Sequence, residues 1–472
     1  MERRSNSDSD IDSSDADGAH ALTRRGADGD PPSRGSLLRV LGVAFGLAVL
    51  VGNTIGMGIL RTPGEVAARL PSVPLFMAVW ILGAVYAFLG ALTVAELAAM
   101  RPRSGGLYPL VHDALGEYPG FIVGWTDWLA TCGSMAAVAM VFGEYVGSLV
   151  PGGVGREAGT ASAVIVTFGV LQWRGVRIGD VAQQLTSLLK SIALIGLAGV
   201  ALVTTVDPVL AAPVTPLAMP TGLAFAGAIV IALQSAIYTY DGWTGPIYFG
   251  EELRDPPRDI PRAMIGGVVL VLVIYLSLNA AFLRVVPIRE MAGDPFVAAT
   301  AASRLFGSAG DVVIRVVMLL SLVATINALQ LMASRVPFAM SRDRLLPAVF
   351  QRVNPGGTPV PALIASTVIA LVCIATNTFN TLLAMLAFLF VANYALVFSA
   401  LFVSRRRAPH ASRPFRVPGY PFVPGLALAG SFAFIVGAVI GDRANSMLAI
   451  ALLVISWPVY RAIRPRAMIV SG

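Results

Sequence analysis

Three glycines in the first long apolar segment could do chemistry through the backbone itself. Gly52, Gly56 and Gly58 fall within one short window. Because glycine costs about 1 kcal/mol relative to alanine inside a helix, the cluster predicts a broken helix. Unwound backbone is tolerated in lipid only where protein buries it or where it lines a cavity. The N–H groups at a helix start suit a carboxylate, and free carbonyls suit an ammonium. An α-amino acid carries both charges on one carbon and is therefore the predicted ligand.

A second interruption follows in the apolar segment 221–250. Gly242, Gly245 and Pro246 break the expected helix, and Asp241 places a carboxyl group at membrane depth. Two interrupted spans, one opening each half of the first ten, are typical of the central site of a secondary transporter. Glycines that only allow close helix packing are the alternative. Packing accounts poorly for two clustered breaks.

One lysine is a candidate for a cation site. Lys190 is the only lysine among 34 basic residues, and it falls inside the expected span 182–205. A charge at a helix centre costs roughly 2.5–3.5 kcal/mol on insertion scales, so it needs a partner or a task. It lies about eight residues from the span edge, roughly 12 Å, which is too deep for its side chain to reach water. We therefore expect a functional role.

The composition indicates an all-α polytopic membrane protein. Of its 472 residues, 56% are hydrophobic and 13% are charged, with a mean hydropathy of +0.75. Several apolar stretches reach the roughly 20 residues that cross a bilayer core. The twelve expected spans lie near 38–67, 73–98, 120–149, 160–172, 182–205, 221–250, 263–283, 312–338, 360–376, 379–403, 421–441 and 446–461.

The distribution of arginine predicts the orientation in the membrane. The net charge is +7, and arginines are more frequent in the loops that face inward if the N-terminus is cytoplasmic. The charge therefore indicates a lipid bilayer as partner and not nucleic acid. Residues 1–36 are polar, without an apolar segment near the start, and are expected to form a disordered cytoplasmic tail. We expect an inner or plasma membrane protein with both termini cytoplasmic.

The sequence argues against catalysis, a cofactor or a metal. It has no Walker-type phosphate loop, and its histidines, His20, His112 and His410, lie outside the expected spans. The spans also lack a His- or Ser-based catalytic constellation. Cys132 and Cys373 fall inside apolar segments and are expected to be small buried residues. We therefore expect neither an enzyme nor a metalloprotein.

Four motifs between residues 40 and 350 carry a family resemblance. They are Ile55-Gly-Met-Gly-Ile-Leu60, Pro102-Arg-Ser-Gly-Gly-Leu-Tyr108, the loop Glu251–Met264 and the segment Asn327–Asp343. They resemble, in order, motifs of amino acid permeases of the amino acid–polyamine–organocation superfamily, and most closely its L-type amino acid transporter group. The resemblance implies a leucine-transporter-like fold with five-plus-five inverted repeats and broken helices one and six. It divides the chain into the tail 1–36, a ten-helix transport core over 37–405, and two additional helices with the C-terminal tail over 406–472.

The resemblance also implies which groups meet the substrate. The N–H groups that would hold its carboxylate surround Gly56, Met57 and Gly58. The carbonyls that would hold its ammonium belong to both breaks, near Thr54, Ile55, Tyr238 and Thr239. Tyr238 occupies the position of the aromatic gate, and Gly242 lies where flexible backbone would set the space for the side chain.

Lys190 matches the family's fifth-helix lysine, whose ammonium stands in for a sodium ion between helices one and eight. Ser321 and Thr325 would be its neighbours on helix eight. This similarity implies transport without sodium, by exchange or with a proton.

Several acidic residues leave alternatives open. Asp241 departs from the glycine of the animal L-type transporters, and it would contact a cationic substrate, take part in proton coupling, or cap the second half of the broken helix. Glu96, at the inner edge of the second span before Arg101, is expected to form a structural ion pair. Asp127 and Glu144 have no assigned role, with local pairing or hydrogen bonding as the default.

The resemblance predicts a carrier of L-amino acids that works by alternating access. Animal L-type chains carry, after the third span, a cysteine that bonds a glycoprotein subunit. The corresponding loop here, about 151–161, has no cysteine, so no disulfide-linked heavy subunit is expected. The alternatives are an amine or polyamine antiporter and a membrane amino acid sensor that does not transport.

Overall fold

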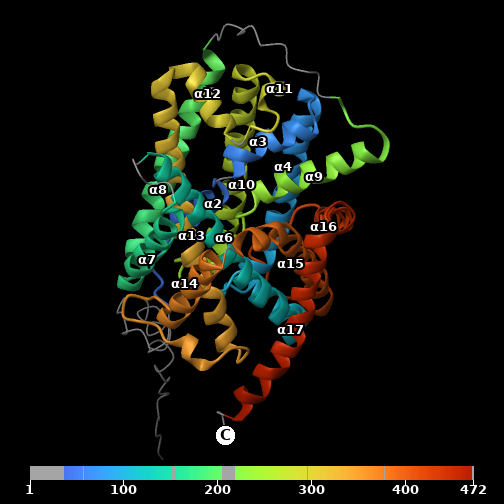
Figure 1. The fold of residues 1–472 in the computed structure, drawn as a ribbon. Coiled ribbons are helices and arrows are strands. Elements are labelled where there is room, and N and C mark those ends of the chain that lie inside the picture. Colours follow the sequence, from blue (N-terminus) through green and yellow to red (C-terminus); the bar gives the residue numbers. More distant parts are fainter. Residues whose placement is uncertain are drawn as a thin grey trace, which may run out of the picture.

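Helices run through nearly all of the described chain, and two of them stop in the middle of the bundle (Figure 1). The structure is a computed structural model that describes residues 37–56, 58–149, 155–204, 218–294, 296–376 and 378–469. The predicted tail 1–36 and Met57 lie outside the described residues. The α-helices and the two 3-10 turns, η1 and η2, are α2 (Val43–Thr54), α3 (Gly58–Arg69), α4 (Val73–Met100), α5 (Tyr108–Leu115), α6 (Glu117–Leu149), α7 (Glu157–Arg174), α8 (Val176–Val203), α9 (Gly222–Tyr240), η1 (Gly245–Tyr248), α10 (Pro256–Val285), α11 (Ile288–Met291), α12 (Val297–Phe306), α13 (Ser308–Arg342), η2 (Ala348–Gln351), α14 (Val360–Ala375), α15 (Phe379–Arg407), α16 (Phe422–Gly441) and α17 (Arg443–Ile469).

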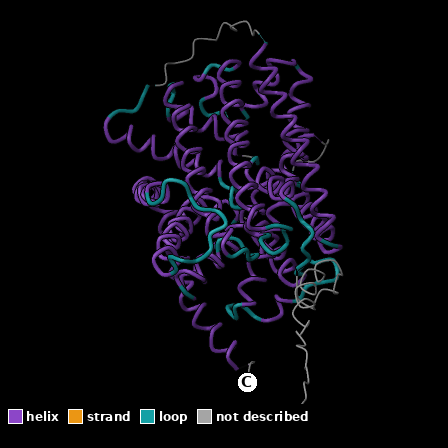
Figure 2. Tube along the Cα trace, turned by 180° about the vertical axis from the view of Figure 1, so that it is seen from behind, coloured by secondary structure: helices purple, strands orange, loops and turns teal. Residues whose placement is uncertain are grey.

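The helices confirm the predicted all-helical membrane protein. Among the described residues, nine helices are long and apolar enough to cross a membrane, and α2 with α3 forms a further span bent by 41°. The shorter helices α7 and α14 occupy the positions of the two remaining expected spans. Figure 2 shows the same trace from behind, with short loops joining the helices. In Figure 1, α2 and α10 lie centrally, α7 and α8 on one side, and α15 to α17 on the other.

Helix α8 shows how the sequence separates a lipid face from a buried face. A stripe of apolar side chains at helical spacing is more than half exposed: Val181, Leu185, Leu188 and Ile192. The opposite face carries the buried polar residues Gln183, Ser187 and Lys190. This pattern reverses that of a water-soluble helix, because here the outer solvent is hydrocarbon. The polar face therefore points at the interrupted first helix.

The first break lies between α2 and α3. Thr54 is the last residue of α2, and Ile55 leaves helical geometry with φ −79° and ψ 78°. The Gly56 N–H then bonds the Thr54 carbonyl at 2.9 Å, which closes a tight turn. The second half of the span, α3, begins at Gly58. The predicted interruption of the first span is confirmed.

The second break lies after α9, which ends at Tyr240. Asp241 is extended (φ −63°, ψ 148°), and Gly242 adopts φ +117°, a value that favours glycine. After this break the chain forms only the 3-10 turn η1 before α10 begins at Pro256. Pro246, which lacks an N–H donor, lies within that turn. The break is confirmed, although its second half is a turn and not a half-helix.

Close contacts between backbones bring the two breaks together. A Cβ atom at Gly242 would lie 2.8 Å from the Thr54 nitrogen, and one at Gly58 would lie 3.2 Å from the Thr239 Cα atom. The end of α2 therefore packs against the break after α9, and the start of α3 packs against the end of α9. Helix α13 contacts α2, α6 and α8, and completes the centre of the bundle.

A buried ion cluster joins α4 to the end of α15 and to the segment that follows it. Glu96 is fully buried and accepts hydrogen bonds from the Nε atoms of Arg405 and Arg413, each at 2.9 Å. It also accepts the Val417 N–H at 2.7 Å. The expected structural ion pair of Glu96 thus forms with arginines more than 300 residues away. Arg101, its neighbour in the sequence, pairs instead with Asp113 at 3.4 Å.

We predict that Glu96→Ala destabilises the protein strongly. The substitution leaves the guanidinium of Arg413, which is 4% exposed, without a carboxylate. Removing one partner of a buried pair costs about 3–5 kcal/mol, which should appear as a lower melting temperature of the detergent-solubilised protein. Glu65→Gln is the control, because its pair with Arg61 spans 3.7 Å and is about half exposed; surface pairs contribute about 0–1 kcal/mol. An equal fall in melting temperature for both variants would contradict the structural role of the Glu96 ion pairs.

Candidate substrate-binding site

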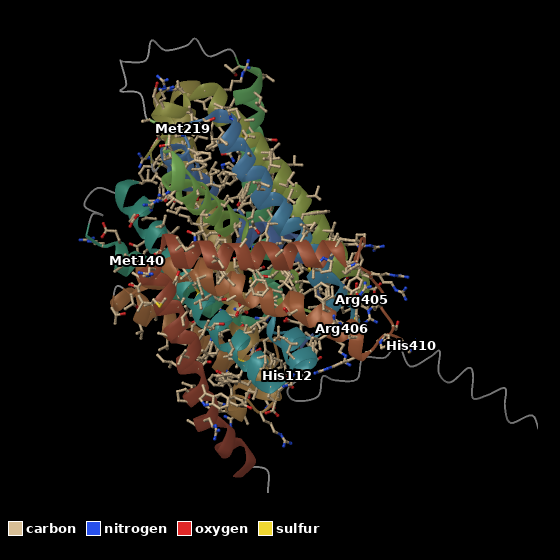
Figure 3. The ribbon with its side chains drawn as sticks, turned by 90° about the vertical axis from the view of Figure 1, so that its right-hand side faces the viewer. His112, Met140, Met219, Arg405, Arg406 and His410 are labelled. Carbon is tan, nitrogen blue, oxygen red and sulfur yellow. The ribbon has the colours of Figure 1, made fainter. Side chains whose placement is uncertain are left out.

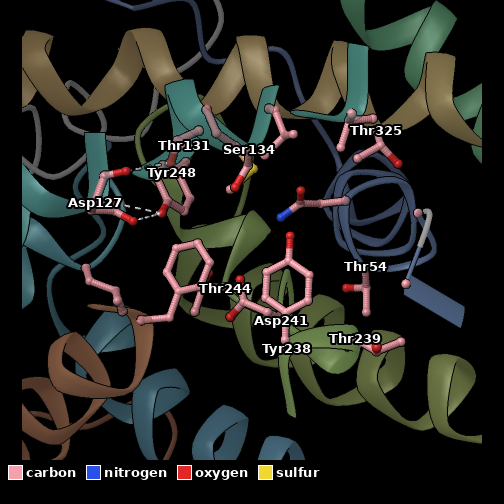
Figure 4. Close-up of a pocket in the computed structure, with 18 of the residues that line it drawn as sticks. Thr54, Asp127, Thr131, Ser134, Tyr238, Thr239, Asp241, Thr244, Tyr248 and Thr325 are labelled. Atoms are coloured by element: carbon pink, nitrogen blue, oxygen red, sulfur yellow. Dashed lines mark hydrogen bonds between the residues drawn. The ribbon is translucent and has the colours of Figure 1, made fainter. Parts of the chain in front are cut away.

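A cavity opens where the two breaks face α6 and α13 (Figure 4). About 690 Å³ of space there is not filled by protein atoms, open solvent included. Of the twelve predicted site residues, those that line it are Thr54, Gly56, Gly58, Tyr238, Thr239, Asp241 and Thr325. Ile55, Gly242, Lys190 and Ser321 lie beside the cavity, and Met57 is outside the described residues.

The start of α3 presents backbone donors to the cavity. The first N–H groups of any α-helix have no partner within the helix, and they carry the positive end of its dipole. Gly58 opens α3 and lines the cavity. The Gly56 N–H was predicted to bind the substrate carboxylate, but in the structure it donates to the Thr54 carbonyl within the turn. The donors that remain available for a carboxylate are those of the first turn of α3.

The carbonyls of the breaks already accept hydrogen bonds from the protein. The Tyr275 hydroxyl lies 2.7 Å from the Thr54 carbonyl oxygen and 3.1 Å from that of Thr239. The Tyr238 carbonyl accepts the Asp241 N–H at 3.1 Å, and the Ile55 carbonyl accepts side-chain donors. The Thr54 carbonyl also accepts the Gly56 N–H, so the Thr54 and Ile55 carbonyls already accept two hydrogen bonds each. The Tyr238 and Thr239 carbonyls are the ones that keep a lone pair for a substrate ammonium. The Asp241 carboxylate, in the same cavity wall, is the stronger acceptor.

Lys190 holds the end of α2 together with two hydroxyls of α13. Its ammonium donates to the Gly52 carbonyl at 2.9 Å and also to the Ile55 carbonyl. Thr325 donates to the Gly52 carbonyl at 2.8 Å, and Ser321 to the Ile55 carbonyl at 2.7 Å. The three residues predicted as a group thus converge on two carbonyls of one break. The partners of this buried ammonium are two backbone carbonyl oxygens, which are also the kind of ligand that a hard metal cation takes.

Two tyrosine–carboxylate pairs complete the cavity wall. The Tyr248 hydroxyl lies 2.8 and 2.7 Å from the two carboxylate oxygens of Asp127. Tyr394 donates to Asp241. Sequence reasoning left Asp127 without a role and missed Tyr248, Tyr275 and Tyr394. A carboxyl group in the middle of an apolar span was the available signal for Asp127, whereas nothing in the sequence separates these tyrosines from packing residues.

Ion pairs fasten the segment after the second break to α13. Arg335 and Glu252 are fully buried and form a pair at 3.0 Å, and Arg342 pairs with Glu251 at 2.6 Å.

Figure 3 shows Arg405, Arg406, His112 and His410 in the half of the molecule away from Met219.

A third arginine ties the loop before α5 to the end of α13. Arg103 binds Asp343 at 2.7 Å, and Tyr108 donates to the same carboxylate at 2.7 Å. Burial and the adjacent Asp343 raise the pKa of Tyr108, so its hydroxyl keeps the proton that it donates.

Comparison with known proteins identifies the family. The model of the family described as amino acid permease matches residues 36–460. The chain belongs to this family. The permease is 30% identical over 436 residues to the serine/threonine exchanger SteT of Bacillus subtilis. This alignment covers 91% of the permease and 98% of SteT. It is 28% identical over 429 residues to the b(0,+)-type amino acid transporter 1 of Mus musculus, in an alignment that covers 89% of the permease and 87% of that transporter. It is also 28% identical over 415 residues to the large neutral amino acids transporter small subunit 2 of Rattus norvegicus, in an alignment that covers 83% of the permease and 76% of that subunit.

The match to the family model extends from residue 36 into α17. The predicted superfamily and its L-type relationship are confirmed. The permease is therefore a multi-pass membrane protein that transports amino acids, and its relatives are transporters rather than enzymes.

We predict that Gly58→Ala impairs substrate handling. The added Cβ would meet the Thr239 side chain at 3.0 Å and the Thr239 Cα atom at 3.2 Å, which would push the start of α3 away from α9. Overpacking of this kind costs about 1–3 kcal/mol, equivalent to roughly 5- to 150-fold in affinity. Uptake of a labelled L-amino acid mixture into liposomes measures the effect. Gly196→Ala is the matched control, because nothing lies within 4 Å of its added Cβ; a similar loss there would refute the steric account.

Proposed function

We propose that this permease is a sodium-independent carrier of L-amino acids that works by alternating access. The observation that carries the proposal is the ammonium of Lys190 on the carbonyls of the first break. A sodium ion at that place would need the same oxygens, which Lys190, Ser321 and Thr325 already occupy. A fixed cation of this kind removes the need to bind sodium in each cycle.

The polarity of the cavity supports an α-amino acid as substrate. The first turn of α3 offers donors to a carboxylate, and Asp241 offers an acceptor to an ammonium on the opposite break. Exchange is favoured over proton coupling by one comparison, because the relative of 30% identity that matches 91% of the chain is named an exchanger. An amine or polyamine antiporter is the second candidate, since Asp241 would suit a substrate without a carboxylate. A sensor that does not transport is disfavoured by the named relatives, which are transporters or exchangers.

We also propose that the permease works without a disulfide-linked subunit. Its two cysteines, Cys132 and Cys373, are both buried, and the loop 151–161 contains none. The arginine distribution supports a cell membrane location with both termini cytoplasmic.

The test of function is exchange in liposomes that hold the purified permease. We expect uptake of a labelled L-amino acid mixture to require unlabelled amino acid inside and to be equal in sodium and choline. Lys190→Ala should lower exchange in choline by about tenfold or more, because it leaves the Gly52 and Ile55 carbonyls at the first break without a charged donor, a loss of about 1.5–3 kcal/mol. Added sodium should restore part of it.

Ser191→Ala is the matched control on the same helix. Its hydroxyl donates to the Ser187 carbonyl of α8 itself at 2.7 Å and does not reach the break. Exchange by this variant should equal that of the unmodified protein. A requirement for sodium in the unmodified protein would sink the proposed role of Lys190. Transport of a diamine in place of amino acids would establish the second candidate.

The purified permease should exchange amino acids as a single chain. We expect one band at the monomer mass on a non-reducing gel of membranes from the native host, and unchanged exchange by the double variant Cys132→Ser, Cys373→Ala. A larger band that disappears on reduction would contradict the absence of a linked subunit.

A further inference from the structure

The cavity extends beyond the breaks to a second carboxylate that the carrier mechanism above does not use. Asp127 is 2% exposed and lines the cavity from α6. Figure 4 shows Asp127 with Tyr248 at one side, Thr54 and Thr325 at the other, and Asp241 with Tyr238 between them. An amino acid bound through its carboxylate at the start of α3 would therefore direct its side chain toward Asp127.

The Asp127 end of the cavity presents hydrogen-bond acceptors. The hydrogen of the Tyr248 hydroxyl is used on the Asp127 carboxylate, and that of Thr131 is used on the Asp127 backbone carbonyl at 2.7 Å. Both hydroxyl oxygens keep free lone pairs, and a carboxylate has about four acceptor positions. An ammonium with three donors or a guanidinium with five is the complementary group.

Charge favours the same kind of ligand. Asp127 and Asp241 line one cavity, and none of the described residues that line it is a lysine, arginine or histidine. Two carboxylates in a water-poor space repel each other when both are ionised, and a buried charge is costly unless it is paired. A ligand with a second positive charge would relieve both costs.

The opposite end of the cavity presents donors. The first turn of α3 has free N–H groups, and Asn53 adds a side-chain amide to the lining. Thr54 is 4% exposed, lines the cavity, and its Oγ1 has no hydrogen-bond partner among the described residues. This hydroxyl is therefore available to donate to a ligand in the cavity. Donors at the break and acceptors at Asp127 thus orient one molecule along the cavity.

We propose that Asp127 and Tyr248 form a distal subsite that binds the terminal ammonium or guanidinium of a substrate side chain. The permease then selects amino acids with cationic side chains over neutral ones of equal length. This inference rests on the proposed function, because it assumes that the α-carboxylate and α-ammonium of the substrate occupy the two breaks. Asp241 takes the α-ammonium, and Asp127 takes the side chain.

The test compares pairs of substrates that differ at the terminal group. Liposomes loaded with a saturating concentration of L-norleucine are clamped at zero membrane potential, so that the internal exchange partner does not depend on Asp127. Initial uptake is measured for L-lysine against L-norleucine and for L-arginine against L-citrulline. We expect the unmodified permease to favour the cationic member of each pair by about tenfold or more, the value of a charged hydrogen bond of about 1.5–3 kcal/mol. Asp127→Asn should lose that preference through slower lysine uptake, with norleucine uptake changed by less than about threefold. Tyr248→Phe should also lower the preference for the cationic substrate, but by a smaller factor than Asp127→Asn.

A matched pair of controls lies on the same helix. Glu117 of α6 also accepts a hydrogen bond from a tyrosine, Tyr460, at 2.9 Å, and it does not line the cavity. Glu117→Gln and Tyr460→Phe should leave both preferences unchanged, which separates a substrate contact from the general loss of a tyrosine–carboxylate bond.

The outcomes distinguish the subsite from the carrier. Equal exchange of lysine and norleucine by the unmodified permease overturns the distal subsite and keeps the amino acid carrier. Failure to exchange any of the four amino acids, with exchange of the labelled mixture retained, overturns the distal subsite alone, and failure with the mixture as well overturns both. Equal losses for lysine and norleucine in a monodisperse Asp127→Asn protein show that the pair only joins α6 to η1, and this also overturns the proposal.

Discussion

The unpaired backbone of the interrupted first helix is the constraint on which the rest of the structure depends. In a bilayer core no water replaces a lost helix hydrogen bond, and an orphaned carbonyl or N–H group costs several kcal/mol. The carbonyls freed at the end of α2 are met by side chains of three other helices: Lys190 of α8, Ser321 and Thr325 of α13, and Tyr275 of α10. These helices therefore turn polar residues inward and leave apolar faces for lipid, as the exposed stripe of α8 shows.

The same constraint explains why the breaks must be adjacent. Groups released by one interruption are useful to a substrate only if the complementary groups of the other lie within the length of a small molecule. Glycine makes this possible, because Gly58 and Gly242 let backbone approach backbone without an intervening Cβ. Gly242 also supplies the positive φ that turns the chain after α9. The result is a site whose donors and acceptors come largely from the main chain.

The fold and the centre of the site could be predicted from the sequence, because both follow from the free-energy cost of particular residue types inside a membrane helix. Glycine clusters in apolar spans and a lone lysine at membrane depth are unfavourable unless they serve a site, so Gly56, Gly58, Gly242 and Lys190 were recognisable individually. Partners across the fold were not. Asp127 offered no local pattern that pointed to Tyr248, and Tyr275 resembles any packed aromatic residue. Glu96 has arginines nearer in sequence than Arg405 and Arg413, which it binds. Long-range pairing depends on helix packing, and a single sequence contains no record of it.

Tyr275 joins the two breaks through a single hydroxyl. Its oxygen lies 2.7 Å from the Thr54 carbonyl and 3.1 Å from the Thr239 carbonyl, and its one hydrogen is shared between them. The ends of α2 and α9 are thereby fastened to α10, which also packs along α2. A movement that separated the end of α2 from the end of α9 would break this shared hydrogen bond, at a cost of about 0.5–1.5 kcal/mol. The hydrogen bond from Tyr248 to Asp127 makes a corresponding link from η1 to α6.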